Sequence, residues 1–268
     1  EVLFDGDKAT GVAIKQDGVR KEIRARVVVD ASGQAALLMN RMKLRLWDPV
    51  LNKGAIWTYW EGAYRDTGKD EGATVVLQTT DKKGWFWYIP LKDNIVSVGV
   101  VSGLEDLFPP GGSRDIAAIY QEQLERCPAA KKRVMPGKQV GPHYTTKDFS
   151  YRCDQVAGDG WVLVGDCAHV VHPLAGQGLN LGLGDVQALC EVLAQREAWR
   201  DLGDERLLRR YQYLREGPVG DLARVCDGLW QLFTPDVSAL RTLRNLGLQA
   251  AQSVGPVRQW LMRQALEA

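Results

Sequence analysis

The residues best suited to chemistry are concentrated between Gly165 and Asn180. Asp166 follows the short apolar stretch from 161 to 164, which predicts a buried strand that ends just before this carboxylate. Pro173 and a glycine-rich turn come next, and apolar residues at helical spacing then predict a helix. Amides at a helix N-terminus carry partial positive charge, whereas Asp166 repels phosphate and can accept hydrogen bonds from hydroxyls. The pattern suits a ligand that joins a hydroxyl-bearing chain to a ring able to gain negative charge.

A reduced flavin has both features, and residues 164–186 resemble the Gly-Asp motif of the FAD-dependent aromatic monooxygenases. The segment is most similar to the branch that contains the ubiquinone-biosynthesis hydroxylases. The resemblance implies that Asp166, with Gly165 before it, binds the ribityl chain, and that Pro173 lies beside the reactive carbon of the isoalloxazine. An ordinary strand–loop–helix crossover is the alternative. The resemblance further implies that one turn presents its backbone amides to the pyrimidine end of the ring: Gly176, Gln177, Gly178, Leu179 and Asn180.

Two histidines and a glycine in this segment admit more than one interpretation. His172, next to Pro173, is a candidate catalytic residue that could line the substrate side, and simple packing is the alternative. His169 and His172 are spaced like a metal-ligand pair, but no third ligand has suitable spacing, so we expect no metal. Gly184 departs from the family, which usually carries a larger and often basic residue at this position.

A second candidate for cofactor binding is the segment Asp-Ala-Ser-Gly at 30–33, which ends a buried-type strand. In the same superfamily such a segment lies near the pyrophosphate and the ribityl chain, which implies cofactor-binding roles for Asp30 and Gly33. A strand-end turn is the alternative. The sequence has no Gly-x-Gly-x-x-Gly loop after an opening strand. We therefore expect the C-terminal two-thirds of a flavoprotein, and whether it binds FAD without the missing unit stays open.

Five of the nine tryptophans lie between residues 47 and 87. Segment 85–90 reads Trp-Phe-Trp-Tyr-Ile-Pro and is similar to the Trp-x-Trp-x-Ile-Pro pattern of the flavin-dependent halogenases. Alternation along a strand places Trp85, Trp87 and Ile89 on one face, which we expect to wall the substrate pocket. Heavy aromatic packing is the alternative. Halogenases usually have Asp-Pro and a Ser-Ser-Gly turn where this chain has the hydroxylase-like residues 172–178, so the two halves resemble different branches.

Composition narrows the class of protein. A net charge of +1 over 268 residues provides no field that would favour nucleic acid. No apolar run approaches the roughly 20 residues that cross a bilayer.

Five widely spaced cysteines indicate reduced thiols in a cytoplasmic protein, with Cys190 packed on its helix. Basic residues 206, 209, 210 and 215 predict a solvated helix face. Trp260, with Arg258 and Arg263, could contact the inner face of a membrane peripherally, although a core tryptophan with solvated charges is favoured.

The fold class expected is an α/β mixture. It consists of a partial, Rossmann-like FAD-binding domain with a β-meander, an antiparallel substrate-domain sheet, and C-terminal helices. The expected ranges are 1–50 for the middle of the FAD-binding domain and 51–142 for the substrate-domain sheet and its helix. Residues 143–200 should return to the FAD-binding domain, and 201–268 should form a helical region. Gly217-Pro218 is expected to end the first helix of that region.

The residues expected beside the flavin favour an FAD-dependent monooxygenase that hydroxylates an aromatic or quinol ring, which could be prenylated. The family implies a flavin C4a-hydroperoxide, with NAD(P)H as transient reductant, in an apolar cavity that excludes water. The first alternative is a flavin-dependent halogenase that receives reduced flavin from a partner reductase. The second is a truncated flavoprotein fragment without catalysis. Substrate identity and oligomeric state cannot be read from the sequence.

Overall fold

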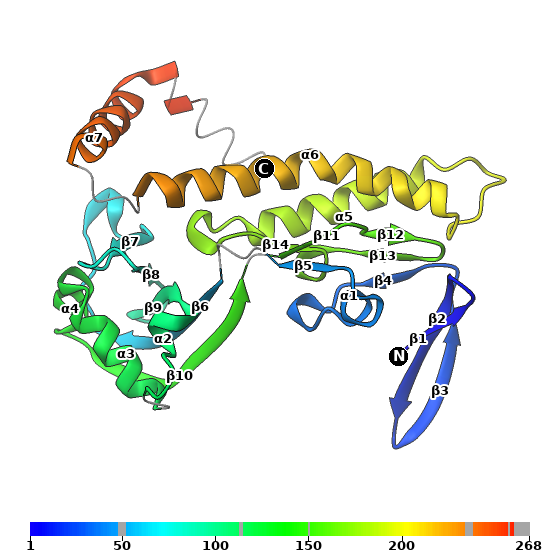
Figure 1. Cartoon of the computed structure of the whole chain (residues 1–268), viewed down its shortest axis with the longest axis horizontal. Coiled ribbons are helices and arrows are strands. Elements are labelled where there is room, and N and C mark those ends of the chain that lie inside the picture. The colour runs from blue at the N-terminus through cyan, green and yellow to red at the C-terminus, as the bar shows by residue number, and fades with distance from the viewer. Residues whose placement is uncertain (48–51, 113–114, 150, 234–237, 257, 260–268) are drawn as a thin grey trace. The chain divides into compact units, whose positions relative to one another are not determined.

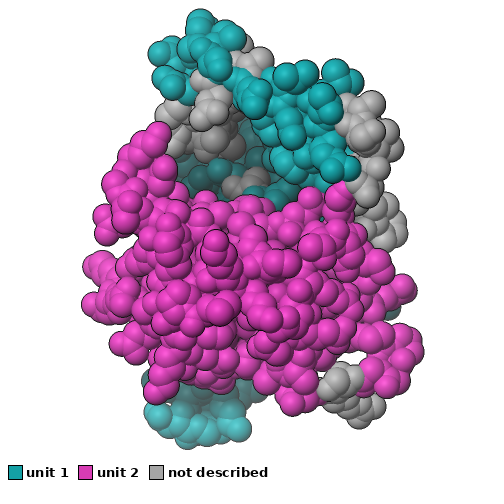
Figure 2. All heavy atoms as spheres, turned by 90° about the vertical axis from the view of Figure 1, so that its left-hand side faces the viewer, with its two compact units in different colours: residues 1–48, 150–268 teal, residues 49–149 magenta. Residues whose placement is uncertain are grey.

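The computed structural model describes residues 1–47, 52–112, 115–149, 151–233, 238–256 and 258–259 (Figure 1). The chain forms two compact units, one made of Glu1–Asp48 with Ser150–Ala268 and the other of Pro49–Phe149 (Figure 2). The chain therefore leaves the first unit once and returns to it, and the functional names expected for the sequence ranges remain predictions. Trp260 and Arg263, considered for membrane contact, lie outside the described residues.

The first unit begins with the predicted β-meander, and an Asp-Gly pair, the usual hairpin-turn signal, lies at each of its two turns, Asp5-Gly6 and Asp17-Gly18. Gly6 and Gly18 have φ values of +59° and +82°, in the left-handed region where an L side chain is strained. All residues of the last strand are exposed, so the first two strands provide the buried contacts, with Val2 and Ala9 among them. The antiparallel strands follow the order β1-β2-β3: β1 (Val2–Asp5), β2 (Lys8–Gln16) and β3 (Val19–Arg24).

Two parallel strands bring the two predicted cofactor-binding segments together. β4 (Val28–Asp30) pairs with β13 (Trp161–Leu163), so that Asp30 lies opposite Leu163. The amide of Val164 donates to the Asp30 carbonyl at 3.0 Å. Because parallel strands end at the same sheet edge, the turns that follow them open at the place where α/β sheets usually bind ligands. The short strand β12 (Ala157–Gly158) completes the order β12-β13-β4.

A further sheet and a mostly apolar core support these turns. The core joins Leu38 and Met39 of α1 (Leu37–Met42) to Trp161, Leu163 and Cys167. The sheet has the order β14-β11-β5, with β14 (His169–Val170), β11 (Tyr151–Cys153) and β5 (Arg45–Trp47). Three short 3-10 helices form the turns themselves: η1 (Gly33–Ala35), η3 (Gly165–Cys167) and η4 (Pro173–Ala175).

The helix after the glycine turn, α5 (Gly178–Ala194), forms where the apolar spacing predicts it, but its buried face only partly coincides with the predicted one. The apolar spacing consists of Leu179, Leu183, Val186, Leu189 and Leu193. Leu189 is buried, but Leu179 at 75%, Leu183 at 59% and Val186 at 50% are largely exposed. Cys190, expected to pack, is also exposed. The helix has apolar residues on two sides, and the contacts with η3 and α6 cover only one of them. The buried stripe consists of Leu181, Asp185, Ala188, Leu189 and Val192.

The next helix, α6 (Glu205–Phe233), packs along α5 and continues through Gly217-Pro218, where the sequence predicted an end (Figure 1). A proline inside a helix removes an N–H and crowds the preceding turn, which usually breaks the helix. Here Leu222 and Cys226, beyond the proline, pack with Leu181, so tertiary contacts stabilise both parts of the helix. α7 (Ser238–Ser253) follows. In the described part of the chain, no helix has the length and apolarity needed to cross a bilayer.

The second unit is the antiparallel sheet that the alternating strands predict, with helices packed on one face. Its core combines alternate strand residues such as Phe86 and Tyr88 with Ile119, Tyr120 and Leu124 of a covering helix. The strand order is β10-β6-β9-β8-β7, with β6 (Lys53–Glu61), β7 (Val75–Gln78), β8 (Gly84–Pro90), β9 (Ile95–Gly103) and β10 (Lys138–Phe149). The helices are η2 (Gly68–Asp70), α2 (Leu104–Leu107), α3 (Ile116–Glu125) and α4 (Pro128–Val134).

Candidate functional site

The Gly165-Asp166 turn has a fixed main chain and an available carboxylate. Gly165 has a φ of +66°, and an added Cβ would meet no atom within 4 Å. Its N–H donates to Asp185 Oδ2 at 2.8 Å, and Tyr151 Oη donates to the Asp166 carbonyl at 2.6 Å. The Asp166 carboxylate is half-buried and has no hydrogen-bond or ion-pair partner among the described residues. Asp166 can therefore accept hydrogen bonds from a ligand.

The loop from 172 to 176 is shaped by His172 and Pro173. Pro173 is the first residue of η4, and the amide of Leu174 donates to His172 Nδ1 at 3.2 Å. His172 is 1% exposed, and its ring centroid lies 5.4 Å from that of Trp230 on α6. Gly176 then adopts a φ of +63°. These contacts give His172 a structural role in the loop, and the predicted catalytic roles of His172 and Pro173 remain predictions.

The N-terminus of α5 offers backbone donors. The residues there, Gly178, Leu179 and Asn180, are exposed, and no side chain caps the helix. The first helical hydrogen bond runs from the Leu181 amide to the Gln177 carbonyl at 3.0 Å, and Asn180 Nδ2 donates to Gln177 Oε1 at 2.6 Å. The first amides of a helix lack intrahelical partners, and the helix dipole adds positive potential. This end of α5 can therefore stabilise a negatively charged ligand oxygen.

Asp30 shapes its own loop. Its carboxylate accepts hydrogen bonds from the amides of Ser32 at 3.0 Å and Leu38 at 2.7 Å, and the residue is 6% exposed. Gly33, with a φ of +62°, has open space where a Cβ would be, and its 3-10 helix packs against η3. Gly33 therefore exposes backbone beside the Asp166 turn, while both Asp30 oxygens are used within the protein.

A buried ion-pair cluster lies behind the turn, and the sequence did not point to it. Asp185 on α5 is fully buried. Besides the Gly165 amide, it binds His169 Nε2 at 2.9 Å and Arg215 Nε at 2.7 Å. Burial alone would raise the pKa of Asp185, but the hydrogen bonds from His169, Gly165 and Arg215 outweigh it and hold the pKa below its usual value. The carboxylate is therefore held in its charged form.

Arg215 corrects the prediction of a wholly solvated basic face on the C-terminal helix. Its side chain is 11% exposed, and Nη2 also donates to the Leu181 carbonyl at 3.1 Å. A Cβ at Gly184 would come within 2.9 Å of Arg215 Nη2, so the glycine leaves room for the guanidinium. The sequence contained one usable signal, because Asp185 is four residues after Leu181 on the stripe that is otherwise apolar.

In the second unit, Trp85, Trp87 and Ile89 share the sheet face opposite the core, because Phe86 and Tyr88 between them belong to the core. Trp85 is 5% exposed, whereas Trp87 and Ile89 are half-buried. This face is the one that the sequence predicts as a wall of the substrate pocket, a role that stays a prediction.

Aromatic rings continue across this face beyond the predicted residues. The Trp57 centroid lies 6.0 Å from that of Trp87 and 5.5 Å from that of Tyr144, which stacks on it. Trp87 Nε1 donates to Ser97 Oγ at 3.2 Å. Gly99 lies beneath the rings, and a Cβ there would be 2.2 Å from Trp87 Cζ2. The sequence did not reveal Gly99, because its partners come from two other strands. The result is an apolar surface suited to a flat ring.

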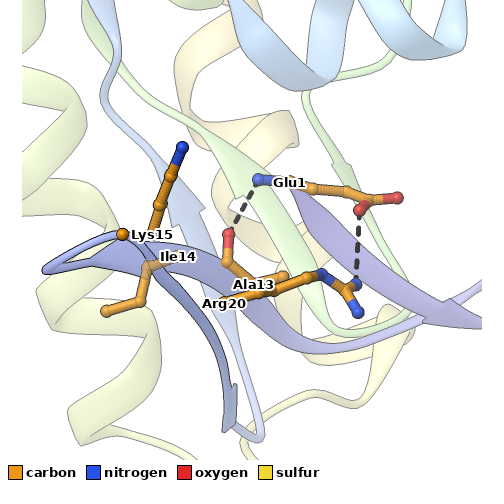
Figure 3. Close-up of a pocket in the computed structure, with 6 residues that line it drawn as sticks. Glu1, Ala13, Ile14, Lys15 and Arg20 are labelled. Carbon is orange, nitrogen blue, oxygen red and sulfur yellow. Dashed lines mark hydrogen bonds and ion pairs between the residues drawn. The ribbon is translucent and has the colours of Figure 1, made fainter.

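A cavity on the meander lies away from this site, and the described residues form no metal-binding cluster. A shallow cavity of about 350 Å³ lies on the meander, lined by Ala13, Lys15 and the mutually bonded Glu1 and Arg20 among others (Figure 3). None of the predicted site residues lines it. Over the described ranges, no group of three or more His, Cys, Asp or Glu side chains is arranged to hold a metal ion.

Known proteins resemble the chain in both sequence and fold. It is 30% identical over 184 residues to the tryptophan 2-halogenase of Chondromyces crocatus. The aligned region covers 67% of this chain and 35% of the halogenase. The ubiquinone hydroxylase UbiL of Rhodospirillum rubrum is 37% identical over 135 residues, 48% of this chain and 30% of the hydroxylase. The flavin-dependent brominase Bmp2 has the same fold, with a TM-score of 0.81 at 23% identity over 99% of this chain and 63% of the brominase.

These matches confirm the resemblance and the fold class predicted from the sequence. The aligned part amounts to about a third of the length of the curated relatives. The family model for the FAD binding domain matches residues 2–222, so the chain belongs to this family of FAD-dependent oxidoreductases.

Proposed function

We propose that the chain is part of a halogenase-like, FAD-dependent oxidoreductase that acts on a small aromatic ring. The sequence favoured a hydroxylase, but flavin-dependent halogenases predominate among the relatives, and this likeness carries the proposal. The shared face of Trp85, Trp87 and Ile89, in the pattern typical of halogenases, supports it further. In such an enzyme, reduced flavin would come from a partner reductase.

The described residues of the first unit fit FAD. At Gly33, Gly165, Gly176 and Gly178, no atom lies within 4 Å of an added Cβ, so a ligand can approach the backbone. The Asp166 carboxylate would accept hydrogen bonds from ribityl hydroxyls, and the first amides of α5 would donate to the carbonyl end of the ring. When bound, FAD would supply the redox chemistry with oxygen, while the protein supplies placement and electrostatics.

The aromatic face of the second unit would receive the substrate ring. Trp57, Trp87 and Tyr144 provide flat apolar surface, and the bond from Trp87 to Ser97 fixes the orientation of one ring. Offset or edge-to-face ring contacts stabilise a bound aromatic by about 0.5–1.5 kcal/mol each.

A hydroxylase remains the second candidate, because residues 172–180 resemble that branch and lack the halogenase turn. Its substrate would be an aromatic or quinol ring, its reductant NAD(P)H, and its location the cytoplasm or the inner membrane face. The two candidates differ in their need for halide and in the source of their electrons.

The test uses purified chain 1–268 with FAD, followed by visible spectroscopy and product analysis by mass spectrometry. Perturbed flavin bands that NAD(P)H bleaches directly, with a hydroxylated product, would support the hydroxylase. A halogenated product that requires bromide or chloride and an added flavin reductase would support the proposal. Absence of flavin binding would contradict an FAD site formed by chain 1–268 alone, and both activities would then require a longer chain. Asp166→Ala should weaken FAD binding and so reduce the spectral perturbation at a given FAD concentration, and Asp154→Ala, which removes an exposed carboxylate, is the control.

A further inference from the structure

One buried carboxylate connects the Gly165-Asp166 turn to α5 and α6. Asp185 is the acidic member of a stripe otherwise made of apolar residues, and it is fully buried. A buried carboxylate is unfavourable unless it is paired and hydrogen-bonded. The contacts with Gly165, His169 and Arg215 meet that condition. Well-packed apolar residues often replace buried ion pairs without loss of stability, so the stability of the fold does not by itself require an acid at this position.

The contact with Gly165 acts on the geometry of the turn. Gly165 adopts a left-handed φ of +66° and directs its N–H to Asp185 Oδ2, while Tyr151 holds the Asp166 carbonyl. The main chain is thus fixed on both sides of the Asp166 side chain. We propose that Asp185 is a positioning residue, which holds this turn so that the Asp166 carboxylate can accept hydrogen bonds from cofactor hydroxyls. This inference rests on the proposed function, because it requires that Asp166 meets FAD.

Arg215 and His169 make a charged acceptor possible at this buried place. Arg215 Nε donates to Asp185 Oδ1, while Nη2 donates to the Leu181 carbonyl, so the guanidinium binds α5 at positions 181 and 185, one turn apart. Gly184 lies between these two positions, and a Cβ there would come within 2.9–3.0 Å of the guanidinium. Oδ2 is then left for Gly165 and His169. A charged acceptor makes shorter and stronger hydrogen bonds than a neutral one, which restricts the turn more closely.

The test compares Asp185→Asn with Tyr211→Phe in chain 1–268. Tyr211 is equally buried, and its hydroxyl donates to the Leu163 carbonyl. Tyr211→Phe therefore removes one buried hydrogen bond but none of the hydrogen bonds of the Gly165-Asp166 turn. Titration of flavin fluorescence gives the FAD Kd, and circular dichroism reports how the bound flavin is held. Asp185→Asn should weaken FAD binding about tenfold and change the flavin dichroism, whereas Tyr211→Phe should leave both unchanged.

A double-mutant cycle separates positioning from general destabilisation. If Asp185 acts through Asp166, Asp185→Asn should have little further effect on the FAD Kd in an Asp166→Ala background. Without cofactor, hydrogen exchange at the Gly165 amide should accelerate in Asp185→Asn, while exchange at the neighbouring Val164 amide, bonded to Asp30, should not. Arg215→Lys provides a milder variant in case Asp185→Asn does not fold, and it should weaken FAD binding several-fold.

The outcomes distinguish the two proposals. Wild-type chain that fails to bind FAD would overturn both the FAD site proposed for chain 1–268 and this inference. Wild-type chain that binds FAD, with an unchanged Kd in Asp185→Asn or in Arg215→Lys where only that variant folds, would overturn the inference alone. Equal weakening with and without Asp166 would also refute it, because Asp185 would then act on the whole unit.

Discussion

Gly99 should tolerate no side chain, because its neighbours leave no space. A Cβ built there lies 2.2 Å from Trp87 Cζ2 and 2.5 Å from Trp57 Cβ, both far below normal contact. The Trp57 atom is next to its backbone, so the Trp87 ring must move. Gly99→Ala should therefore displace Trp87 and break its hydrogen bond to Ser97.

Three contributions determine how far Gly99→Ala lowers the free energy of unfolding. Overpacking costs about 1–3 kcal/mol, and the broken hydrogen bond adds about 1 kcal/mol. Replacement of glycine by alanine in a strand stabilises the folded state by about 0.5–1 kcal/mol, because the unfolded chain loses conformational freedom. Gly99→Ala should thus lower the free energy of unfolding by about 1–3.5 kcal/mol.

Urea denaturation gives this free energy, and near-ultraviolet circular dichroism reports the coupling between the tryptophan rings. Gly72→Ala is the matched control, because no atom lies within 4 Å of its added Cβ. Trp87→Phe combined with Gly99→Ala should recover part of the loss, since a smaller ring relieves the clash. A Gly99→Ala variant as stable as the Gly72 control, with an unchanged dichroism spectrum, would refute the reasoning.

Three further predictions concern the first unit. Tyr211→Phe should lower the free energy of unfolding by about 1 kcal/mol, because it removes the 2.8 Å bond to the Leu163 carbonyl; an unchanged urea midpoint would contradict this. Pro218→Ala should raise the melting temperature, because proline inside a helix costs up to about 3 kcal/mol; a lower melting temperature would show that the proline is needed. Burial raises the pKa of Cys167 to about 12, so almost none of this thiol is ionised at pH 8. Iodoacetamide should therefore label exposed Cys190 first, and labelling of Cys167 in the folded protein should increase with pH; equal labelling of the two at pH 8 would contradict the burial.

Local patterns predicted much of the fold. The alternation in segment 85–90 indicated which side chains share a face, because side chains in any strand alternate. The Asp-Gly turns predicted the meander, and the strand before Asp166 and the helix after Gly178 formed where their apolar residues indicated. Each of these signals depends on residues close together in the sequence.

Tertiary contacts determine the two features that the sequence did not predict, the burial of Arg215 and the continuation of α6 through Pro218. Arg215 leaves the solvated face because Asp185, thirty positions earlier, offers a buried partner and Gly184 offers space. α6 passes through Pro218 because residues beyond it pack on α5. Local propensity opposes the continuation of α6 and is neutral toward the burial of Arg215, so only the packed structure reveals them.

The register of β6 and β10 has a consequence for how the protein folds. It pairs Lys53 with Phe149, the two ends of the second unit. The parallel partners β4 and β13 are separated in sequence by that whole unit, so their pairing requires closure of a long loop. If the second unit folds first, it closes that loop in advance and lowers the entropy loss of the β4–β13 pairing. Pulse-labelled hydrogen exchange should then show amides of β6 and β9 protected before those of β4 and β13, and the reverse order would exclude this route.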